Sequence, residues 1–263
     1  MKDNTPEYTP VEKIGGVYVK RDDLYCRAGI QGGKVRACWH LATHGLKPCE
    51  GLITASARKS PQAQIVARLA NVLGIPARCH MPTGGLTEEM KDVEAHGGTL
   101  IQHRAGYNNV LIARAMADHK TRKRWRYIPF GMEHPAAVKC TRAQVANVPR
   151  GVKRIVIPLG SGISAAGVLH GLRDCKIDVP VLGVRVGADP IKRLNAFGPF
   201  AWHEQMTIVK TRIAYHKSIT AHIGDVPLDP IYEAKCLEYV RQGDLLWVVG
   251  IRAPVIIIPG MQG

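Results

Sequence analysis

The stretch KRIVIPLGSGISAAGVLHGLRD occupies residues 153–174. It begins as an apolar run typical of a buried strand, turns at Gly160, Ser161 and Gly162, and continues with apolar residues at helical spacing. A strand that leads through glycines into a helix aims several backbone N–H groups at one point, with serine hydroxyls beside them. The stretch therefore predicts a loop that binds one phosphate, although small residues would also let a helix lie close to a sheet.

Two common nucleotide-binding motifs do not explain this loop. Lys34 lies far upstream and is followed by Val35 rather than by serine or threonine, so the chain has no Walker A motif. The glycine spacing G-x-G-x-x-x-x-G, without a ribose-binding acid downstream, also argues against a dinucleotide fingerprint.

The segments on either side alternate between strand and helix patterns. Upstream, the sequence predicts strands at 52–56, 76–82, 99–103 and 127–131, and helices at 60–74, 86–98 and 107–120. Downstream, it predicts a strand at 181–186, a helix at 232–241 and a strand at 244–250. This rhythm predicts mostly parallel sheets with helices on both faces, in two three-layer α/β/α lobes. The lobes would comprise residues 44–147, and residues 1–43 together with 148–263.

The composition is typical of a folded protein of 263 residues, with 46% hydrophobic and 22% charged residues. No apolar run approaches the ~20 residues that span a bilayer. The polar N-terminus lacks a signal region, so a cytoplasmic protein is expected. The seven cysteines form no CxxC pair, and His40 and His44 lack the acidic residue of the metalloprotease pattern, so no metal site is predicted.

The net charge of +15 favours anionic partners, and its densest block is HKTRKRWR at residues 119–126. This block has two interpretations. It could contact nucleic acid through phosphate groups. It could also be a solvated helix end, where cations complement the helix dipole.

A second distinctive stretch is QGGKVRACWH, residues 31–40, in which two glycines lead directly into Lys34 at the expected start of a helix. A lysine beside glycines, in a chain that also offers a phosphate loop, suggests Schiff-base chemistry. Pyridoxal phosphate requires one lysine amine for its aldehyde, one phosphate site and one partner for its ring nitrogen.

Residues 17–41 resemble the segment around the cofactor lysine in pyridoxal-phosphate enzymes of the tryptophan-synthase-β fold type, or fold type II, nearest to 1-aminocyclopropane-1-carboxylate deaminase and D-cysteine desulfhydrase. Lys20, Arg21, Asp22 and Asp23 match the Lys-Arg-Glu/Asp-Asp run of that segment, and Gly32, Gly33, Lys34 and Arg36 match its Gly-Gly-Asn-Lys-x-Arg run. Residues 52–75, 160–167 and 226–237 resemble three further blocks of the family, in family order.

The resemblance implies pyridoxal 5'-phosphate bound between the lobes, with Lys34 forming the internal aldimine and later moving the α-proton. It also implies roles for other residues. The phosphate would be held by Gly160, Ser161, Gly162 and Ser164, and Glu233 would face the pyridine nitrogen. Tyr232 would act near the substrate as an acid/base or orienting group, Ser60 would lie beside the substrate carboxylate or the cofactor, and Gln62 would lie near Ser60.

The implied function is that of a lyase or deaminase acting at the α-carbon of an amino acid or amino-acyl group, in a homodimer.

Two departures from the family pattern leave alternatives open. Pro61 replaces the asparagine that binds the cofactor's phenolic oxygen, and Gly250, Ile251 and Arg252 replace a closing His-Thr-Gly-Gly. The substrate group could be carried by a nucleotide or nucleic acid, as in phage-type base modification. The chain could also be a non-catalytic relative that binds only cofactor or nucleic acid.

Overall fold

The computed structural model describes residues 8–250, except residues 46 and 105. Residues 1–7 and 251–263, which the sequence analysis assigns to the same lobe as Lys34, fall outside this part. Contacts divide the chain into two compact units. Within the described part, the first unit comprises residues 8–41 and 131–250, and the second comprises residues 42–130.

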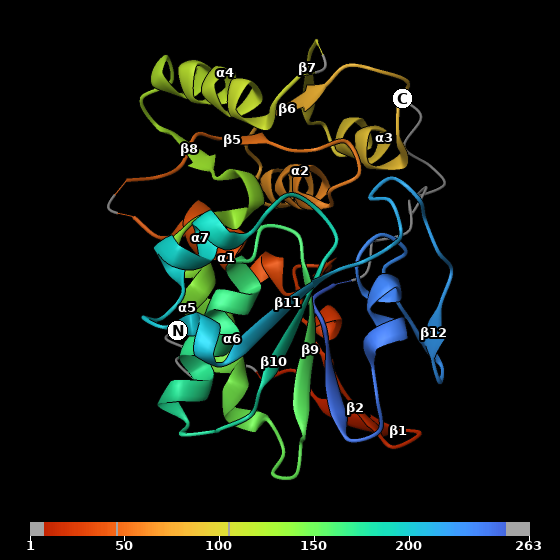
Figure 1. The fold of residues 1–263 in the computed structure, drawn as a ribbon. Helices are drawn as coiled ribbons and strands as arrows, with labels where there is room; N and C mark the ends of the chain where they lie inside the picture. Colours follow the sequence, from red (N-terminus) through yellow and green to blue (C-terminus); the bar gives the residue numbers. More distant parts are fainter. Residues whose placement is uncertain (1–7, 46, 105, 251–263) are drawn as a thin grey trace. The chain divides into compact units, whose positions relative to one another are not determined.

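A six-stranded sheet forms the centre of the first unit, with the strand order β1-β2-β14-β9-β10-β11 (Figure 1). Its strands are β1 (Val11–Ile14), β2 (Val17–Arg21), β9 (Arg154–Leu159), β10 (Val181–Arg185), β11 (Met206–Lys210) and β14 (Asp244–Val248). The β1–β2 pair is antiparallel, and every other neighbouring pair is parallel. Strand β14 therefore lies between β2, from the start of the chain, and β9.

Helices cover both faces of this sheet. They are α1 (Lys34–Thr43), α5 (Pro135–Ala143), α6 (Ile163–Asp174), α7 (Ile191–Phe197) and the 3-10 helix η5 (Glu233–Tyr239). Helices α5, α6 and α7 lie on one side of the sheet (Figure 1). On the other side, Val156, Val184 and Leu246 of the sheet form one buried apolar cluster with Ile231 and Cys236. Burial on both faces explains why the central strands β9 and β14 are almost continuously apolar.

The second unit has three layers around a four-stranded parallel sheet of order β7-β6-β5-β8. Its elements are β5 (Gly51–Ala55), α2 (Gln62–Val72), β6 (Ala77–Pro82), α3 (Glu88–Ala95), β7 (Thr99–His103), α4 (Asn108–Lys120) and β8 (Trp125–Ile128). On one face, Ala63 of α2 and Met90 of α3 pack against Met81. On the other face, Leu111 of α4 packs against Ile53.

Short elements connect these layers. They are the 3-10 helices η1 (Asp22–Leu24), η2 (Phe130–Met132), η3 (Gln144–Asn147) and η4 (Trp202–Glu204), and the two-residue strands β3 (Cys26–Arg27), β4 (Ile30–Gln31), β12 (His222–Ile223) and β13 (Val226–Pro227). No helix in the part of the chain that the structure describes is long and apolar enough to cross a membrane.

The fold confirms the predicted mixture of helices with mostly parallel sheets, and three local features differ from the sequence-based expectation. Helices α5 and α7 and strand β11 were not predicted. The segment expected to be a helix at 232–241 is the 3-10 helix η5, closed by i→i+3 bonds such as Lys235 N–H to Tyr232 O. The units divide before Gly131 rather than after residue 147, because α5 packs along α6.

Two glycines of α6 allow this close packing of α5. A Cβ atom at Gly167 would lie 2.6 Å from Thr141 Cβ and 2.8 Å from Val138 O. A Cβ atom at Gly171 would lie 2.5 Å from Val145 Cγ2 and 2.6 Å from Arg142 O. Since backbone carbonyl atoms take part in both contacts, a side-chain rotation would not relieve the overlap.

We expect Gly167→Ala to lower the free energy of unfolding by about 1–3 kcal/mol, because the added methyl group pushes α5 and α6 apart. This loss should exceed the gain in helix propensity that alanine normally brings. Denaturant unfolding of the variant measures the change. Gly85→Ala is the matched control, because nothing lies within 4 Å of a Cβ atom at that glycine. An unchanged or raised free energy of unfolding for Gly167→Ala would contradict the packing described.

Candidate active site

Three loops of the first unit meet at the carboxyl end of its parallel strands. The chain leaves β2 toward Lys34, leaves β9 at Gly160, and leaves β14 at Val249. Because β2, β14 and β9 are parallel neighbours, these exits share one edge of the sheet. A cavity at this edge is lined by residues from all three exits and from α5 and η2: Asp22, Gly33, Lys34, Ala37, Gly131, Met132, Ala137, Thr141, Ser161, Ile163, Ser164 and Val249.

The turn after β9 presents backbone to this cavity. Gly162 has a φ of +90° and caps the N-terminus of α6, a conformation that glycine adopts without strain. A Cβ atom at Gly160 would lie 3.0 Å from Tyr232 Cε1, so this position has little room for a side chain. The Ser161 hydroxyl donates to the carbonyl of Gly131 at 2.7 Å. The loop is thus held in place, and Ile163 and Ser164, in the first turn of α6, line the cavity.

The glycines before Lys34 let its backbone approach the end of β14. Gly32 has a φ of +110°, and the Gly33 N–H donates to Val249 O at 2.9 Å. A Cβ atom at Gly33 would lie 3.1 Å from the same carbonyl and 2.8 Å from Asp22 Cγ. Helix α1 begins at Lys34 itself. The two glycines therefore fix where the lysine enters the helix.

Glu233 is a buried carboxyl group with one oxygen that has no partner among the described residues. The Val249 N–H donates to its Oε1 at 2.9 Å, whereas its Oε2 is unpaired. The side chain belongs to a residue that is 1% exposed. Burial, and then the nearby Asp229 carboxylate, raise the pKa of Glu233 well above its usual range. The raised pKa favours the protonated form of this buried carboxyl group.

Tyr232, directly before Glu233, pairs with a residue that the sequence did not indicate. Its hydroxyl lies 3.2 Å from that of Tyr215, and the two rings meet edge to face. The buried Lys235 ammonium donates to Ala214 O at 2.8 Å and to Tyr215 O at 3.0 Å, which fixes the Tyr215 backbone. Tyr215 lies outside any regular element, so no periodic pattern could have identified it.

Ser60 and Gln62 belong to the second unit. Ser60 lies just before α2, and its Oγ accepts from the Gln62 N–H at 3.4 Å. Gln62 is 1% exposed; its amide donates to Thr54 Oγ1 at 2.9 Å and to Pro129 O at 2.7 Å. Its Oε1 has no partner among the residues that the structure describes. Gln62 thus ties α2 to β5 and to the segment after β8.

The structure therefore brings most of the predicted site residues together within the first unit. Lys34, Ser161 and Ser164 line one cavity, Gly160 borders Tyr232, and Glu233 binds the backbone of Val249. Ser60 and Gln62 form their own group in the second unit. Over residues 8–250 without 46 and 105, no group of three or more His, Cys, Asp or Glu side chains is arranged to hold a metal ion.

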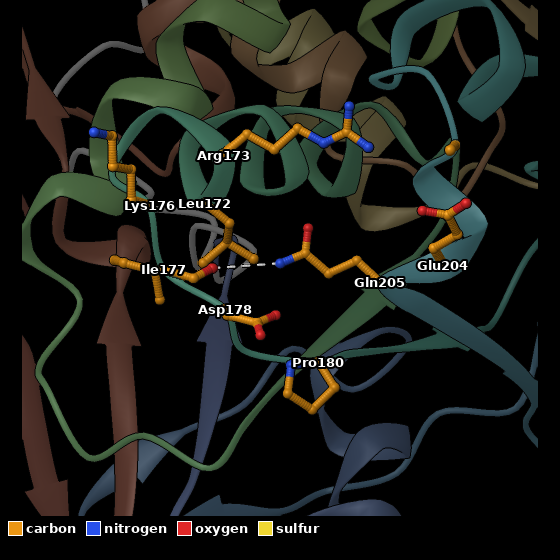
Figure 2. A pocket seen from close by; sticks show the side chains of 9 residues that line it. Leu172, Arg173, Lys176, Ile177, Asp178, Pro180, Glu204 and Gln205 are labelled. Atoms are coloured by element: carbon orange, nitrogen blue, oxygen red, sulfur yellow. Dashed lines mark hydrogen bonds between the residues drawn. The ribbon is translucent and has the colours of Figure 1, made fainter.

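A larger hollow of about 480 Å³ lies at the opposite end of the same sheet, beside the end of α6 and the starts of β10 and β11 (Figure 2). The Gln205 amide donates a hydrogen bond across it to the Ile177 carbonyl at 3.4 Å, and the Arg173 guanidinium donates to the Phe200 carbonyl. None of the predicted site residues lines this hollow. It is separate from the cavity at Lys34.

Comparison with known proteins identifies the family. The sequence profile described as pyridoxal-phosphate dependent enzyme matches residues 5–233, and the chain belongs to this family. The biosynthetic L-threonine dehydratase of Pasteurella multocida (strain Pm70) is 28% identical over 180 residues, which are 66% of this chain and 33% of the dehydratase. The chain thus spans about a third of the length of that relative.

Solved structures of the same fold agree with this assignment. A homologue of 1-aminocyclopropane-1-carboxylate (ACC) deaminase superposes with a TM-score of 0.79 at 22% identity, covering 93% of this chain and 90% of that one. The processed form of threonine deaminase isoform 2 from Solanum lycopersicum has a TM-score of 0.66 at 17% identity, covering 94% and 80%. These likenesses confirm the fold type that the sequence motifs predicted.

We expect the buried carboxyl group of Glu233 to make the cofactor-free protein less stable as pH rises. Its pKa is raised in the folded state, so the folded protein keeps a proton that the unfolded chain loses above pH ~4.3. The contribution of Glu233 to stability is complete below that pH and declines as pH rises toward the folded-state pKa.

The variant Glu233→Gln, which carries no titrating proton, should therefore gain stability relative to the native chain as pH rises above ~4.3 toward the raised pKa of Glu233. Denaturant unfolding at a series of pH values measures this difference, and the acidic end, where both side chains are uncharged, is the baseline. A difference that stays constant over the series would contradict the buried neutral carboxyl group.

Proposed function

We propose that this protein is a pyridoxal-phosphate dependent lyase or deaminase that acts at the α-carbon of an amino acid, with Lys34 as the residue that binds the cofactor covalently. The observation that carries the proposal is the grouping in one unit of Lys34, the Gly160–Gly162 turn and the unpaired buried oxygen of Glu233. These are the three partners that the cofactor requires.

The residues present fit the cofactor. The backbone N–H groups after Gly160, together with Ser164 on the first turn of α6, would bind the phosphate group. Because Gly160 has no side chain, the Tyr232 ring can lie against the turn that would hold the phosphate. The Lys34 amine would bind the aldehyde. The Oε2 atom of Glu233 would face the ring nitrogen, which supplies the partner that this buried oxygen lacks among the described residues.

When bound, pyridoxal phosphate draws electrons from the α-carbon of an amino acid, so that a group on this carbon can leave. Glu233 could share a proton with the ring nitrogen, because burial and Asp229 raise the pKa of its carboxyl group. Lys34 Nζ is the base proposed to move the α-proton. The paired hydroxyls of Tyr232 and Tyr215, 3.2 Å apart, can pass a proton or orient the substrate.

An amino-acid substrate is supported by the names of the similar proteins. One relative is a threonine dehydratase, and one neighbouring structure is an ACC deaminase homologue. Ser60 and Gln62, at the start of α2, are proposed to contact the substrate or the cofactor. The unpaired Gln62 Oε1 supports this role, because a buried acceptor without a partner among the described residues is costly unless a ligand satisfies it.

The alternative of a substrate group carried by nucleic acid rests on the net charge of +15. Within the basic block, Arg122 pairs with Asp118, Arg124 pairs with Glu50, and Arg126 donates to two backbone carbonyls. These bonds support the interpretation of the block as a helix end, since α4 finishes at Lys120. We therefore favour the free amino acid.

The variant Lys34→Ala should lack the visible absorption band that the native protein shows with pyridoxal phosphate. Borohydride treatment of the native protein should add the mass of the reduced cofactor to the peptide that contains Lys34. Turnover of a panel of amino acids should fall by at least ~10³-fold in the variant, because the residue that moves the α-proton is lost.

Lys192→Ala is the matched control, because Lys192 is exposed on α7. A cofactor mass on a different lysine would contradict the assignment of Lys34. A protein that binds the cofactor at Lys34 but turns over no member of the panel would be a non-catalytic relative.

A further inference from the structure

Asp22 lies at the end of β2 and packs against the backbone that leads into Lys34. A Cβ atom at Gly33 would overlap Asp22 Oδ2 and would lie 2.8 Å from Asp22 Cγ. The carboxylate therefore occupies the space that a side chain at Gly33 would fill. Gly33 is the residue directly before Lys34, so the position of Asp22 limits the position of the lysine.

Two further residues bind the Asp22 carboxylate through its other oxygen, Oδ1. Its Oδ1 accepts from Arg36 Nη1 at 2.5 Å and from Thr9 Oγ1 at 3.2 Å. The Asp22 side chain is 3% exposed and that of Arg36 is 10% exposed. Arg36 also lies over the ring of Tyr25, 4.0 Å from its centre. Since Oδ1 takes both bonds, Oδ2 is the oxygen directed at Gly33.

Asp22 and Lys34 are the only charged residues among the described residues that line the cavity. The titratable groups around them come from three elements. Burial raises the pKa of the Cys38 thiol on α1 to about 12 and raises that of Cys140 on α5, so both are neutral. Burial lowers the pKa of Lys20 on β2 to about 8, and Asp22 opposes this. Arg36, and Lys139 on α5, are cations that act on the Cys140 thiol.

We propose that Asp22 is a positioning residue for Lys34: the carboxylate, anchored by Arg36 and Thr9, fixes the Gly33–Lys34 backbone and supplies the negative charge that acts on the Lys34 amine across the shared cavity. This proposal rests on the proposed function, in which Lys34 binds the cofactor. A buried ion pair such as Asp22–Arg36 adds little net stability, which favours a role in setting position and charge.

Charge-removing variants of the two partners should shift the pKa of Lys34 in opposite directions. Asp22→Asn removes an attractive charge and should lower this pKa by about 1–2 units, whereas Arg36→Gln removes a repulsive charge and should raise it. The measurement is the rate of acetylation of Lys34 across a pH series in the cofactor-free protein, read by mass spectrometry. The exposed Lys192 of α7 serves as the internal standard in the same samples. At a pH below the pKa of Lys34, a decrease of about 1–2 units raises the fraction of uncharged amine by about 10- to 100-fold, so labelling of Lys34 in Asp22→Asn should rise by a factor in this range.

A purely structural effect would disturb Lys34 similarly in both variants. Shifts of the same sign, or no shift in Asp22→Asn, would therefore overturn the proposal. The acetylation assay needs no cofactor, so it tests Asp22 independently of the proposed function. Borohydride fixation of pyridoxal phosphate in the native protein tests that function separately: label absent from Lys34 would refute the function, whereas opposite pKa shifts would still support the coupling to Asp22.

Discussion

The insertion of β14 between β2 and β9 is the constraint on which the candidate site depends. This strand comes from the last part of the described chain, yet it pairs in parallel with one strand from the first part and one from the middle. Parallel pairing places the ends of all three strands at one edge. Val249 can therefore accept the Gly33 N–H at 2.9 Å and donate to Glu233 at 2.9 Å, which links the lysine loop to the buried carboxyl group.

Several ionisable side chains of the first unit are buried away from water. The Glu233 carboxyl group, the Asp22 carboxylate and the Lys235 ammonium are all nearly inaccessible. Burial raises the pKa of Glu233 and so favours its protonated form, Asp22 pairs with Arg36, and Lys235 donates to two backbone carbonyls. Glu233 Oε2 and Gln62 Oε1 are among the buried polar atoms without a partner in the part of the chain that the structure describes.

Much of this arrangement could be predicted from sequence because the informative signals are local. The Gly-Gly-Lys run and the turn at Gly160 each lie within a few residues, and the β-α rhythm follows from short periodic windows. Tyr232 and Glu233 were indicated only by the resemblance to the family. Long-range contacts gave no such signal. Tyr215 reaches Tyr232 across an irregular segment, and α5 is too weakly apolar to be recognised without the glycines of α6 that receive it. The hydrogen bond from Arg36 to Asp22 likewise gave no local signal, because it joins residues 14 positions apart in the chain.

The strand order also has a consequence for biosynthesis. Residues 17–21 form β2 but are hydrogen-bonded to residues 244–248, so this edge of the first sheet stays open until almost the whole described chain has left the ribosome. The four strands of the second unit come from one continuous segment and can pair much earlier. Nascent chains should therefore carry a folded central segment while β2 still lacks β14 as its partner. During this interval the unpaired backbone of β2 is accessible to chaperones or to aggregation.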